Sequence, residues 1–433
     1  MSELRFLRLW LHVPSGERRA IGYLSRLGDV LRVSFDAAYI EDPARPTLSL
    51  SLVGATEQAT RAILGSAHDS RLVRQDGRCP TFFQNLLPEG HNRTRLARER
   101  GCAEEDELEL LAAAGHDLFG AVEVEPVPLS AGVPEAIRLW HAAMGIDVLE
   151  PSVVQAPIED AASLPGVVTK FSAIQEGTRY VVKRHGRAGD FIVKLPSTRH
   201  PDLVDNELTG YRLAAALHLD CASAMRVARA DVDLPETVPF DHALVVRRFD
   251  RGEGGRRVHM EEMAQALSYT PREKYGRGLD HDAPRVLRVL DRLSARPGRD
   301  LAEWVRRLVA FALMGNTDAH LKNWALVYPD GIRPVLAPLY DPVCVAAWFP
   351  ALADAEYAVN RRIDETLRAL DEHKLHALLL AADVPARAKL RAEARAAVAE
   401  AKALWPAILV DAPDNVRASV TERLAGGVAL ARA

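Results

Sequence analysis

A polar run, NTDAHLKN at 316–323, lies between the apolar stretches FALMG (311–315) and WALVY (324–328). Polar side chains that are buried without partners are costly, so such groups must be paired or put to use. A further aspartate, Asp341, ends another apolar run in VLAPLYD (335–341). The chain must therefore fold so that partners or a ligand meet these residues.

Residues 1–127 are predicted to form a small α+β domain, and the Pro- and Ala-rich stretch 128–160 is interpreted as a connector. Strands are predicted from alternating apolar and polar residues between turn signals, and helices from acids or proline at the start and glycine at the end. The predicted elements are strands at 4–13, 18–25, 30–36, 47–53 and 117–126, and helices at 88–101 and 104–115.

The remainder of the chain begins with strands and continues with helices. Two extended runs, 178–185 and 189–196, are predicted to be neighbouring strands, and helices dominate from about residue 258. The other predicted elements are a helix at 201–219, a strand at 242–250 and helices at 300–315 and 385–405. Three tryptophans in apolar context are predicted to lie in the core: Trp304, Trp324 and Trp348.

The composition is that of an ordinary globular protein, with 433 residues and a formal net charge of −4. At roughly 150 residues per domain, this length indicates two or three domains. The charge does not favour a dedicated nucleic-acid binder. No CxxC pair occurs among the four cysteines, which argues against zinc and disulfides and favours a reducing compartment. No signal peptide or membrane-spanning run is seen, so a cytoplasmic location without membrane contact is expected.

The spacing of the polar residues matches the needs of phosphoryl transfer from ATP. This reaction needs a carboxylate to orient the attacking hydroxyl, and Asn and Asp oxygens to hold magnesium. In protein kinases the base Asp precedes the metal-binding Asn by five residues, and a second metal-binding Asp follows a hairpin. Asp318, Asn323 and Asp341 occur in this order. They are predicted as the catalytic base and the two magnesium ligands, respectively.

Other parts of a nucleotide site are predicted upstream. Lys194 ends the apolar strand of DFIVKLP (190–196), where a lysine is costly unless it meets an anion. Glu207 in the next helix is expected to pair with it, as in kinases. The segment LVVRRFDR (244–251) stands where a hinge between lobes should follow, and its backbone is expected to bind adenine. The hinge residues expected to contact the nucleotide are Val246, Arg248 and Phe249.

Each residue alone also has a simpler interpretation. Asp318 has the residue type of a helix cap, Lys194 could extend its ammonium to solvent, and Asp341 before proline could begin a turn. His320 is interpreted as a structural hydrogen-bond partner rather than a metal ligand. The kinase interpretation depends on the order of Lys, Glu, hinge, Asp, Asn and Asp in one chain. It predicts an α+β fold, in which a small N-terminal α+β domain precedes a protein-kinase-like domain with an N-lobe at 161–250 and a largely helical C-terminal lobe at 251–433.

Several segments together resemble the HipA family of bacterial toxin–antitoxin kinases. The matching segments are FFQNLLPEG (82–90), DLFGAVEV (117–124), DFIVKLP, DNELTGYRLA (205–214), VVRRFDR, VHMEEMAQAL (258–267), GNTDAHLKNWALVY (315–328) and PLYDPV (338–343). The resemblance extends from about residue 5 to about residue 400.

This resemblance implies a serine/threonine protein kinase that binds ATP with Mg²⁺. It also implies a HipB-like helix-turn-helix antitoxin as partner, co-repression of an operon through that antitoxin, and a translation-related protein substrate such as an aminoacyl-tRNA synthetase. Carried over by motif, Asp318 resembles the catalytic base, Asn323 and Asp341 the magnesium ligands, and Lys194 the phosphate-binding lysine. Lys322 is expected to neutralise charge near the transferred phosphate.

Two departures from the family pattern are visible. Family members commonly carry an SISG-like loop whose second serine is autophosphorylated, whereas this chain has SLPGVVTKFSA at 163–173. Pro165 cannot accept a phosphate, and Ser163 is the remaining serine nearby. Residues 166–170 are still expected to lie over the nucleotide phosphates, with Gly166 allowing close approach of the backbone. Arg247 is the second departure, because relatives often have an acid in the hinge.

The two arginine-rich segments 91–101 and 247–257 are predicted to be solvated faces with local ion pairs, the alternative being phosphate contacts to operator DNA. Two rival functions remain at this stage. A small-molecule kinase would share the Asp, Asn and Asp arrangement, but the LLPEG segment argues against it. A catalytically weakened co-repressor would be the non-enzymatic alternative, and the presence of Lys194, Asp318, Asn323 and Asp341 argues against it.

Overall fold

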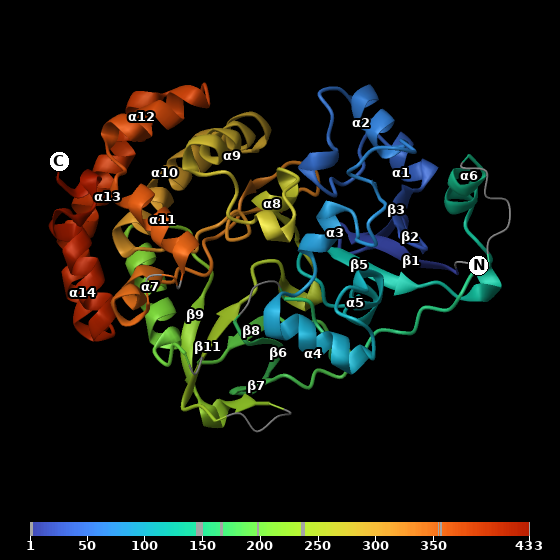
Figure 1. Cartoon of the computed structure of the whole chain (residues 1–433), viewed down its shortest axis with the longest axis horizontal. Coiled ribbons are helices and arrows are strands. Elements are labelled where there is room, and N and C mark those ends of the chain that lie inside the picture. The colour runs from blue at the N-terminus through green and yellow to red at the C-terminus, as the bar shows by residue number, and fades with distance from the viewer. Residues whose placement is uncertain are drawn as a thin grey trace.

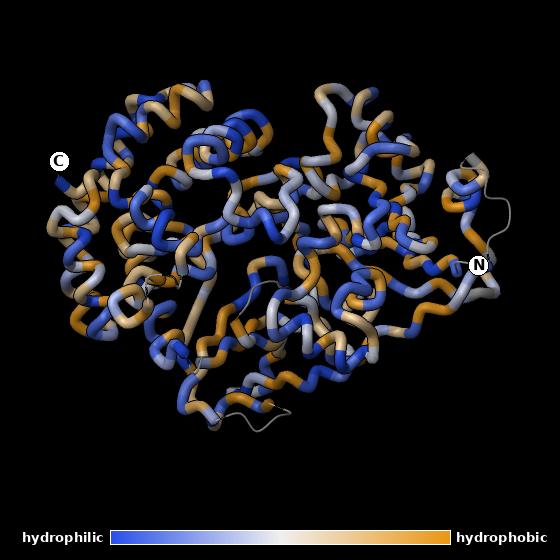
Figure 2. The backbone as a smooth tube through the Cα atoms, viewed as in Figure 1, coloured by the Kyte–Doolittle hydropathy of each residue, from blue (hydrophilic) through white to orange (hydrophobic). Residues whose placement is uncertain are grey.

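The computed structural model describes residues 3–143, 150–164, 168–196, 199–234, 239–353, 355 and 357–432. Figure 1 shows an N-terminal domain at one end and a group of C-terminal helices at the other. A second sheet, contributed by the middle of the chain, lies beside both. Figure 2 shows apolar and polar residues interspersed along most helices and strands.

The N-terminal domain is a five-stranded antiparallel sheet in the order β4-β3-β2-β1-β5. Alternate residues of its first strand, Leu7, Leu9 and Leu11, are fully buried, which is the period-2 pattern that predicts the strand. Its strands are β1 (Leu4–His12), β2 (Arg18–Leu27), β3 (Val30–Phe35), β4 (Val73–Arg74) and β5 (Val122–Pro126). Its helices are α1 (Ala37–Glu41), α2 (Glu57–Leu64), α3 (Thr81–Asn85), α4 (Gly90–Arg100) and α5 (Glu107–Ala113).

The predicted strand at 47–53 is wrong. This segment instead forms a short 3-10 helix, Leu50–Leu52. The Ser49 hydroxyl and the Leu50 N–H donate to the two oxygens of Glu261, at 2.7 and 2.8 Å. These contacts to a residue far along the chain override the local alternation. The predicted connector also contains a helix, α6 (Glu135–Ala143).

The second sheet has the order β10-β7-β6-β8-β11-β9. The two runs predicted as neighbours, β7 and β8, are instead separated by β6, which pairs antiparallel with both. The sequence of β6, KFSAIQE, lacks a clean alternation. Its first four residues belong to the segment 163–173, which is predicted to be a loop. The strands are β6 (Lys170–Glu176), β7 (Arg179–Val181), β8 (Phe191–Lys194), β9 (Ala224–Ala228), β10 (Val232–Asp233) and β11 (His242–Arg247), and the helix beside them is α7 (Leu203–Ala216).

The C-terminal part is largely helical, as predicted, and Trp304, Trp324 and Trp348 are buried in it. Its helices are α8 (Met263–Ala266), α9 (Leu279–Leu293), α10 (Pro297–Met314), α11 (Ala358–Arg368), α12 (Glu372–Ala381), α13 (Arg387–Ile408) and α14 (Asp414–Glu422). A small sheet, β12 (His259–Glu262), β13 (Ala325–Tyr328) and β14 (Val335–Leu336), lies among them.

This small sheet joins the two large hydrophobic cores. Along β13, Leu326 and Tyr328 belong to the core of the helical lobe, whereas Ala325 and Val327 belong to the core of the N-terminal domain. Alternate side chains of one strand point to opposite faces, so both cores pack against β13. The strand that follows the polar cluster is thereby fixed from both sides.

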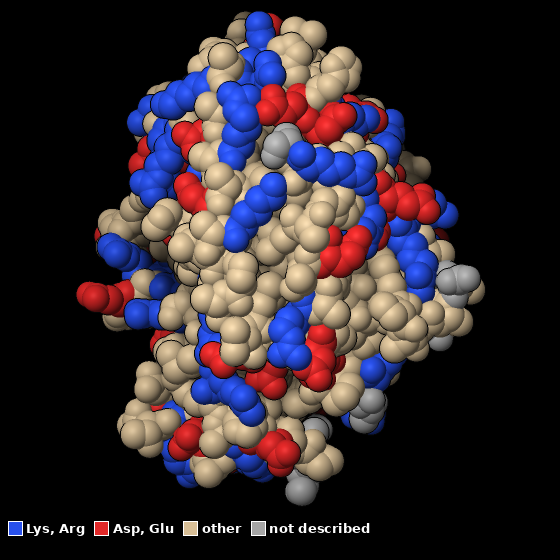
Figure 3. Space-filling model, turned by 90° about the vertical axis from the view of Figure 1, so that its left-hand side faces the viewer, with Lys and Arg blue, Asp and Glu red and all other residues tan. Residues whose placement is uncertain are grey.

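The outer face formed by the C-terminal helices carries interspersed positive and negative side chains around uncharged residues (Figure 3). Several of these charges are paired, including Arg391 and Arg395 with Glu372 on α12. All four cysteines are free. Within the described residues, no helix has the length and apolar character needed to span a membrane.

Candidate active site

The polar cluster lies in the loop between α10 and β13. Gly315 ends α10 with a φ of +71°, a conformation that glycine adopts without strain. Asn316 Oδ1 then accepts the N–H of Asp318 at 3.2 Å, and the Asp318 carbonyl accepts the side-chain amide of Asn323 at 2.8 Å. These bonds close the loop and hold Asp318 and Asn323 side by side.

Lys194 meets two carboxylates. Its ammonium donates to Glu207 Oε1 and to Asp341 Oδ1, each at 2.6 Å. The expected strand-lysine to helix-glutamate pair is therefore present, and the aspartate of PLYDP joins it. Lys194 and Glu207 are almost fully buried, so each charge depends on the others for compensation.

The backbone at Asp341 is held in an unusual conformation by α7. Asp341 has a φ of +55°, in the left-handed region. The Asn206 side chain accepts the N–H of Cys344 at 2.8 Å and donates to its carbonyl at 3.3 Å. Gly210 lets the chain pass closely, because a Cβ there would lie 1.6 Å from the Pro342 carbonyl oxygen. Any side chain at Gly210 would therefore displace the segment that carries Asp341.

In the triad of Lys194, Glu207 and Asp341, the pKa values of Lys194 and Glu207 are raised and that of Asp341 is lowered. Burial works against the charge on Lys194, but Asp341 and Glu207 together raise the pKa of its ammonium above the usual range. Burial raises the pKa of Glu207. For Asp341 burial acts in the same sense, but Lys194 and Lys170 outweigh it and lower the pKa of this carboxyl. Asp341 is therefore ionised at neutral pH and available to a cation.

One cavity gathers the predicted residues. Its lining includes every described residue of the predicted site, namely Lys194, Val246, Arg248, Phe249, Asp318, Lys322, Asn323 and Asp341. Gly166 and Pro165 lie outside the described residues. The exposed Arg247 also lines this cavity, at its rim.

The hinge segment does not offer all of its backbone. The N–H groups of Arg247 and Arg248 donate to the carbonyls of Ser223 and Asp190, at 2.8 and 2.9 Å. Those two donors are therefore already engaged, and the expectation that the backbone of this segment binds adenine stays a prediction. The apolar side chains of Val246 and Phe249 line the cavity instead.

The Arg248 side chain points into a buried ionic network. Arg248 and Arg251 donate to Asp117 Oδ1 at 2.8 and 3.0 Å, and Arg184 donates to Asp117 Oδ2 at 2.8 Å. Asp250 also pairs with Arg248 and Arg251. Arg248 and Arg251 are buried, so they are neither solvated nor available to DNA. Both interpretations of the segment 247–257 are therefore wrong for these two arginines. They join the hinge to the N-terminal domain.

One residue of this site, Tyr275, is not predicted from the sequence, whereas Lys170 belongs to the stretch 166–170 that is predicted to lie over the phosphates. The Tyr275 hydroxyl donates to Asp318 Oδ1 at 2.7 Å. Burial, with Asp318 beside it, raises the pKa of Tyr275, so the phenol remains a donor. Lys170 is buried on β6 opposite Lys194, and burial lowers the pKa of its ammonium. Tyr275 comes from the loop EKYGRG (273–278), where no local pattern marks it.

The LLPEG segment also reaches the cavity. Glu89 pairs with Lys322 at 2.8 Å and with Lys274 at 3.0 Å, and these cations, acting against burial, lower its pKa to about 2. Lys322 also lies 3.6 Å from Glu262. Glu89 of the N-terminal domain thus holds the Lys322 ammonium in the lining of the cavity. This contact connects the N-terminal domain to the loop of Asp318.

Glu262 gives a test of these electrostatics. Burial raises its pKa to about 8 from an ordinary 4.5, despite Lys322. Between about pH 4.5 and about pH 8, the folded chain keeps the proton on the Glu262 carboxyl, whereas the unfolded chain has released it. Its stabilising contribution is therefore complete below about pH 4.5 and is lost as the pH rises towards 8. Glu262→Gln is expected to flatten this loss, by up to about 1.4 kcal/mol per pH unit.

The measurement is the free energy of unfolding from about pH 5 to about pH 8.5, by urea denaturation followed by circular dichroism. Glu365→Gln, at an exposed position of α11, is the matched control and should follow the wild type. Parallel pH profiles for wild type and Glu262→Gln would show that this carboxyl is ionised in the folded chain.

The residues present fit a magnesium ion shared with a phosphate ligand. The Asn323 amide nitrogen is engaged with the Asp318 carbonyl, which leaves its amide oxygen as the ligand atom. Asp341 uses Oδ1 for Lys194, which leaves Oδ2. Among the described residues no three His, Cys, Asp or Glu side chains form a metal cage. Mg²⁺ characteristically takes one or two protein ligands and completes its shell with phosphate and water.

Two family models match this chain. The family model described as HipA N-terminal domain matches residues 13–125, and the one described as HipA-like C-terminal domain matches residues 162–405. The chain belongs to the HipA family. The resemblance seen in the sequence is therefore confirmed.

Two curated relatives match this chain over most of their own length. "Putative kinase Y4dM" of Sinorhizobium fredii is 34% identical over 86% of this chain and 86% of its own. "Putative kinase Y4mE" of the same organism is 28% identical over 85% of this chain and 83% of its own.

A solved structure shares the fold. HipA of Shewanella oneidensis MR-1, in a complex with HipB and its operator DNA, has a TM-score of 0.63 and 22% identity. The match covers 98% of this chain and 96% of that protein. This similarity confirms the predicted α+β, kinase-like fold.

Proposed function

We propose that this HipA-family chain is a serine/threonine protein kinase that transfers the γ-phosphoryl group of ATP to a protein hydroxyl. The observation that carries the proposal is the convergence of Lys194, Asp318, Asn323 and Asp341 on one cavity. Relatives that cover most of the chain are named as kinases, which supports the reaction class.

Each side chain has a role that its contacts support. Asp318 accepts the Tyr275 hydroxyl through Oδ1, so Oδ2 remains to accept the proton of the attacking hydroxyl. Lys194, oriented by Glu207, provides positive charge for the phosphates of ATP. Asn323 and Asp341 would hold Mg²⁺, which supplies charge neutralisation at the phosphate oxygens when bound. Phe249 and Val246 would pack against the adenine ring of ATP.

The biological setting follows from the family. The Shewanella relative is found with HipB and operator DNA, and we infer a HipB-like antitoxin as partner of this chain, with operator contact made through that antitoxin. The formal net charge of −4 supports DNA binding by the partner rather than by this chain. As the HipA resemblance implies, we place the substrate among translation-related proteins, such as an aminoacyl-tRNA synthetase, whose phosphorylation would arrest growth.

The test is incubation of purified protein with γ-labelled ATP, Mg²⁺ and a cell extract, followed by phosphoamino-acid analysis. Label on serine or threonine of a protein is the expected result. Label found only in a metabolite would instead indicate a small-molecule kinase. No transfer at all would indicate a co-repressor whose catalytic activity has weakened.

Autophosphorylation of the 163–173 segment is expected to be negligible. Ser163 is fully buried, its hydroxyl donates to the Leu86 carbonyl, and its N–H donates to the Asp117 carbonyl at 3.1 Å. The hydroxyl is therefore both inaccessible and engaged. Phosphopeptide mapping after incubation with ATP and Mg²⁺ should find no phosphate on Ser163. Stoichiometric phosphate there would mean that this segment leaves the position described.

A further inference from the structure

A second cavity, of about 330 Å³, lies beside the loop of Asp318 and has no assigned role. Its lining includes Thr317 and Ala319, the immediate neighbours of Asp318, and His320 one position further on. His320 also lines the nucleotide cavity. The Tyr275 side chain, which donates to Asp318, forms another part of the lining. A group seated in this cavity would therefore lie close to the acceptor hydroxyl.

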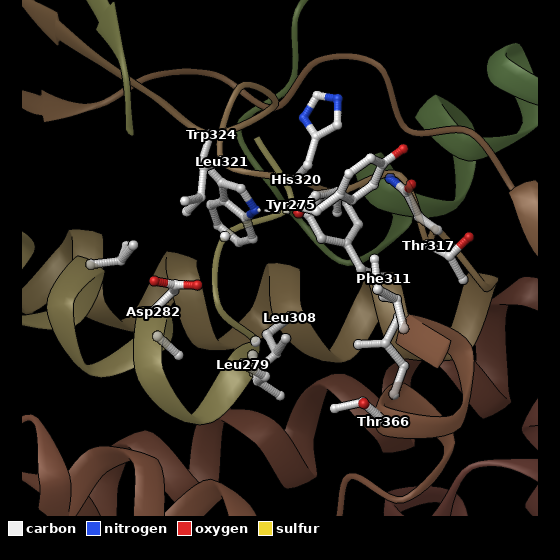
Figure 4. Close-up of a pocket in the computed structure, with 18 of the residues that line it drawn as sticks. Tyr275, Leu279, Asp282, Leu308, Phe311, Thr317, His320, Leu321, Trp324 and Thr366 are labelled. Carbon is white, nitrogen blue, oxygen red and sulfur yellow. Dashed lines mark hydrogen bonds between the residues drawn. The ribbon is translucent and has the colours of Figure 1, made fainter. Parts of the chain in front are cut away.

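The interior of this cavity is mostly apolar. Figure 4 shows Leu279, Leu308 and Trp324 around a common space, below the loop that carries His320. Trp304 and Trp324 have ring centroids 5.8 Å apart, and Phe311 meets Trp324 edge-on at 5.3 Å. These three packed aromatic rings provide a large apolar surface in the lining. Ligand pockets in proteins have volumes from roughly 300 Å³ upward. This cavity, at about 330 Å³, has room for the largest amino-acid side chain.

Two arginines stand beside this cavity, and the acidic side chain in its lining, Asp282, already accepts the Tyr269 hydroxyl and the Arg277 N–H. Arg362 on α11 lines the cavity, and the glycines on both sides of Arg277 also line it. Both arginines are exposed. Across the described part of the chain, neither guanidinium has a hydrogen bond or an ion pair, although arginine pairs readily with carboxylates. An occupant with an apolar group and an adjacent negative charge would complement the cavity and these two arginines.

We infer that this cavity binds a large apolar side chain of the acceptor protein, carried beside an acidic residue a few positions from the phosphorylated serine or threonine. The inference rests on the proposed kinase function and adds its substrate class. A segment running past Asp318 would place its hydroxyl at the carboxylate, its apolar residue among the aromatic rings, and its acid against Arg277 and Arg362. Selectivity would thus come from one anchor residue and one charge.

The test uses a positional-scanning library of serine-centred peptides with γ-labelled ATP and the full chain. Wild type is expected to label peptides with Leu, Met, Phe or Trp at one position at least tenfold more than those with Ala there, and to favour a neighbouring Asp or Glu. Ile363→Trp, which fills the cavity from α11, should abolish the apolar preference while labelling the Ala peptides as the wild type does. Thr366→Trp fills the cavity from its exposed edge and serves if Ile363→Trp does not fold.

Two further variants test the preference for an acid separately and control for the substitution by tryptophan. Arg362→Glu should reverse the preference for an acid and keep that for the apolar residue. Glu365→Trp, exposed on the same helix and not part of the lining, should behave as the wild type. Peptide labelling without any apolar preference, or labelling of extract proteins but of no peptide, would overturn the inference and leave the kinase proposal standing. No transfer to any acceptor would overturn both.

Discussion

Asp318→Asn is expected to lower kcat for phosphoryl transfer by about 10²- to 10⁴-fold, which is the usual contribution of a positioned general base. The amide keeps the shape of the carboxylate, and its oxygen can still accept the Tyr275 hydroxyl. It cannot accept the proton of an attacking hydroxyl. The KM for ATP and the melting temperature should change little, because Asp318 is not part of the buried triad around Lys194. The measurement is initial-rate transfer of label to the acceptor protein.

Asp330→Asn is the matched control for this prediction. Asp330 is an exposed aspartate in the turn between β13 and β14, and its carboxylate accepts the N–H groups of Ile332 and Arg333. Its substitution should leave kcat within about twofold, since surface changes away from the site have small effects. An Asp318→Asn enzyme with near-normal turnover would show that another group takes the proton.

Asp117→Ala is expected to lower the free energy of unfolding by about 3–5 kcal/mol, the effect of removing one partner from a buried ion pair. Asp117 is fully buried and lies between three arginines, with Ser172 also donating to it at 2.6 Å. Burial raises the pKa of this carboxyl, but the three arginines outweigh burial and hold the pKa well below its usual range. Without Asp117, buried guanidinium groups of Arg184, Arg248 and Arg251 would lose an anion.

Asp233→Ala provides the comparison at the surface. Asp233 and Arg179 approach to 3.6 Å, and about half of each side chain is exposed. Such pairs contribute at most about 1 kcal/mol. Urea denaturation of both variants measures the difference directly. Equal losses for Asp117→Ala and Asp233→Ala would contradict the view that this network fastens the hinge to the N-terminal domain.

The sequence predicts much of the fold because most elements carry a clean period and clear ends. The three strands β1, β2 and β3 alternate, and α10 runs without a break to the glycine that ends it. The order of Lys194, Glu207, Asp318, Asn323 and Asp341 also indicates one site, since phosphoryl transfer in kinases uses these residue types in this order. The structure places all five along the same cavity.

The remainder depends on contacts between distant segments. Nothing local marks Ser49 as a partner of Glu261, so 47–53 looks like a strand. Tyr275 reaches Asp318, and Glu89 reaches Lys322, only after the domains have packed. The arginines at 248, 251 and 257 look solvated in sequence because their buried partners lie in the N-terminal domain. Tertiary pairing of this kind leaves no periodic signal along the chain.

The decisive measurement is a crystal structure with Mg²⁺ and a non-hydrolysable ATP analogue. The terminal phosphates are expected to lie between Lys194 and the Asp318 loop, with the metal ion against the oxygens of Asn323 and Asp341 and the adenine beside Val246 and Phe249. A nucleotide bound elsewhere, or a metal ion that contacts neither Asn323 nor Asp341, would contradict this expectation.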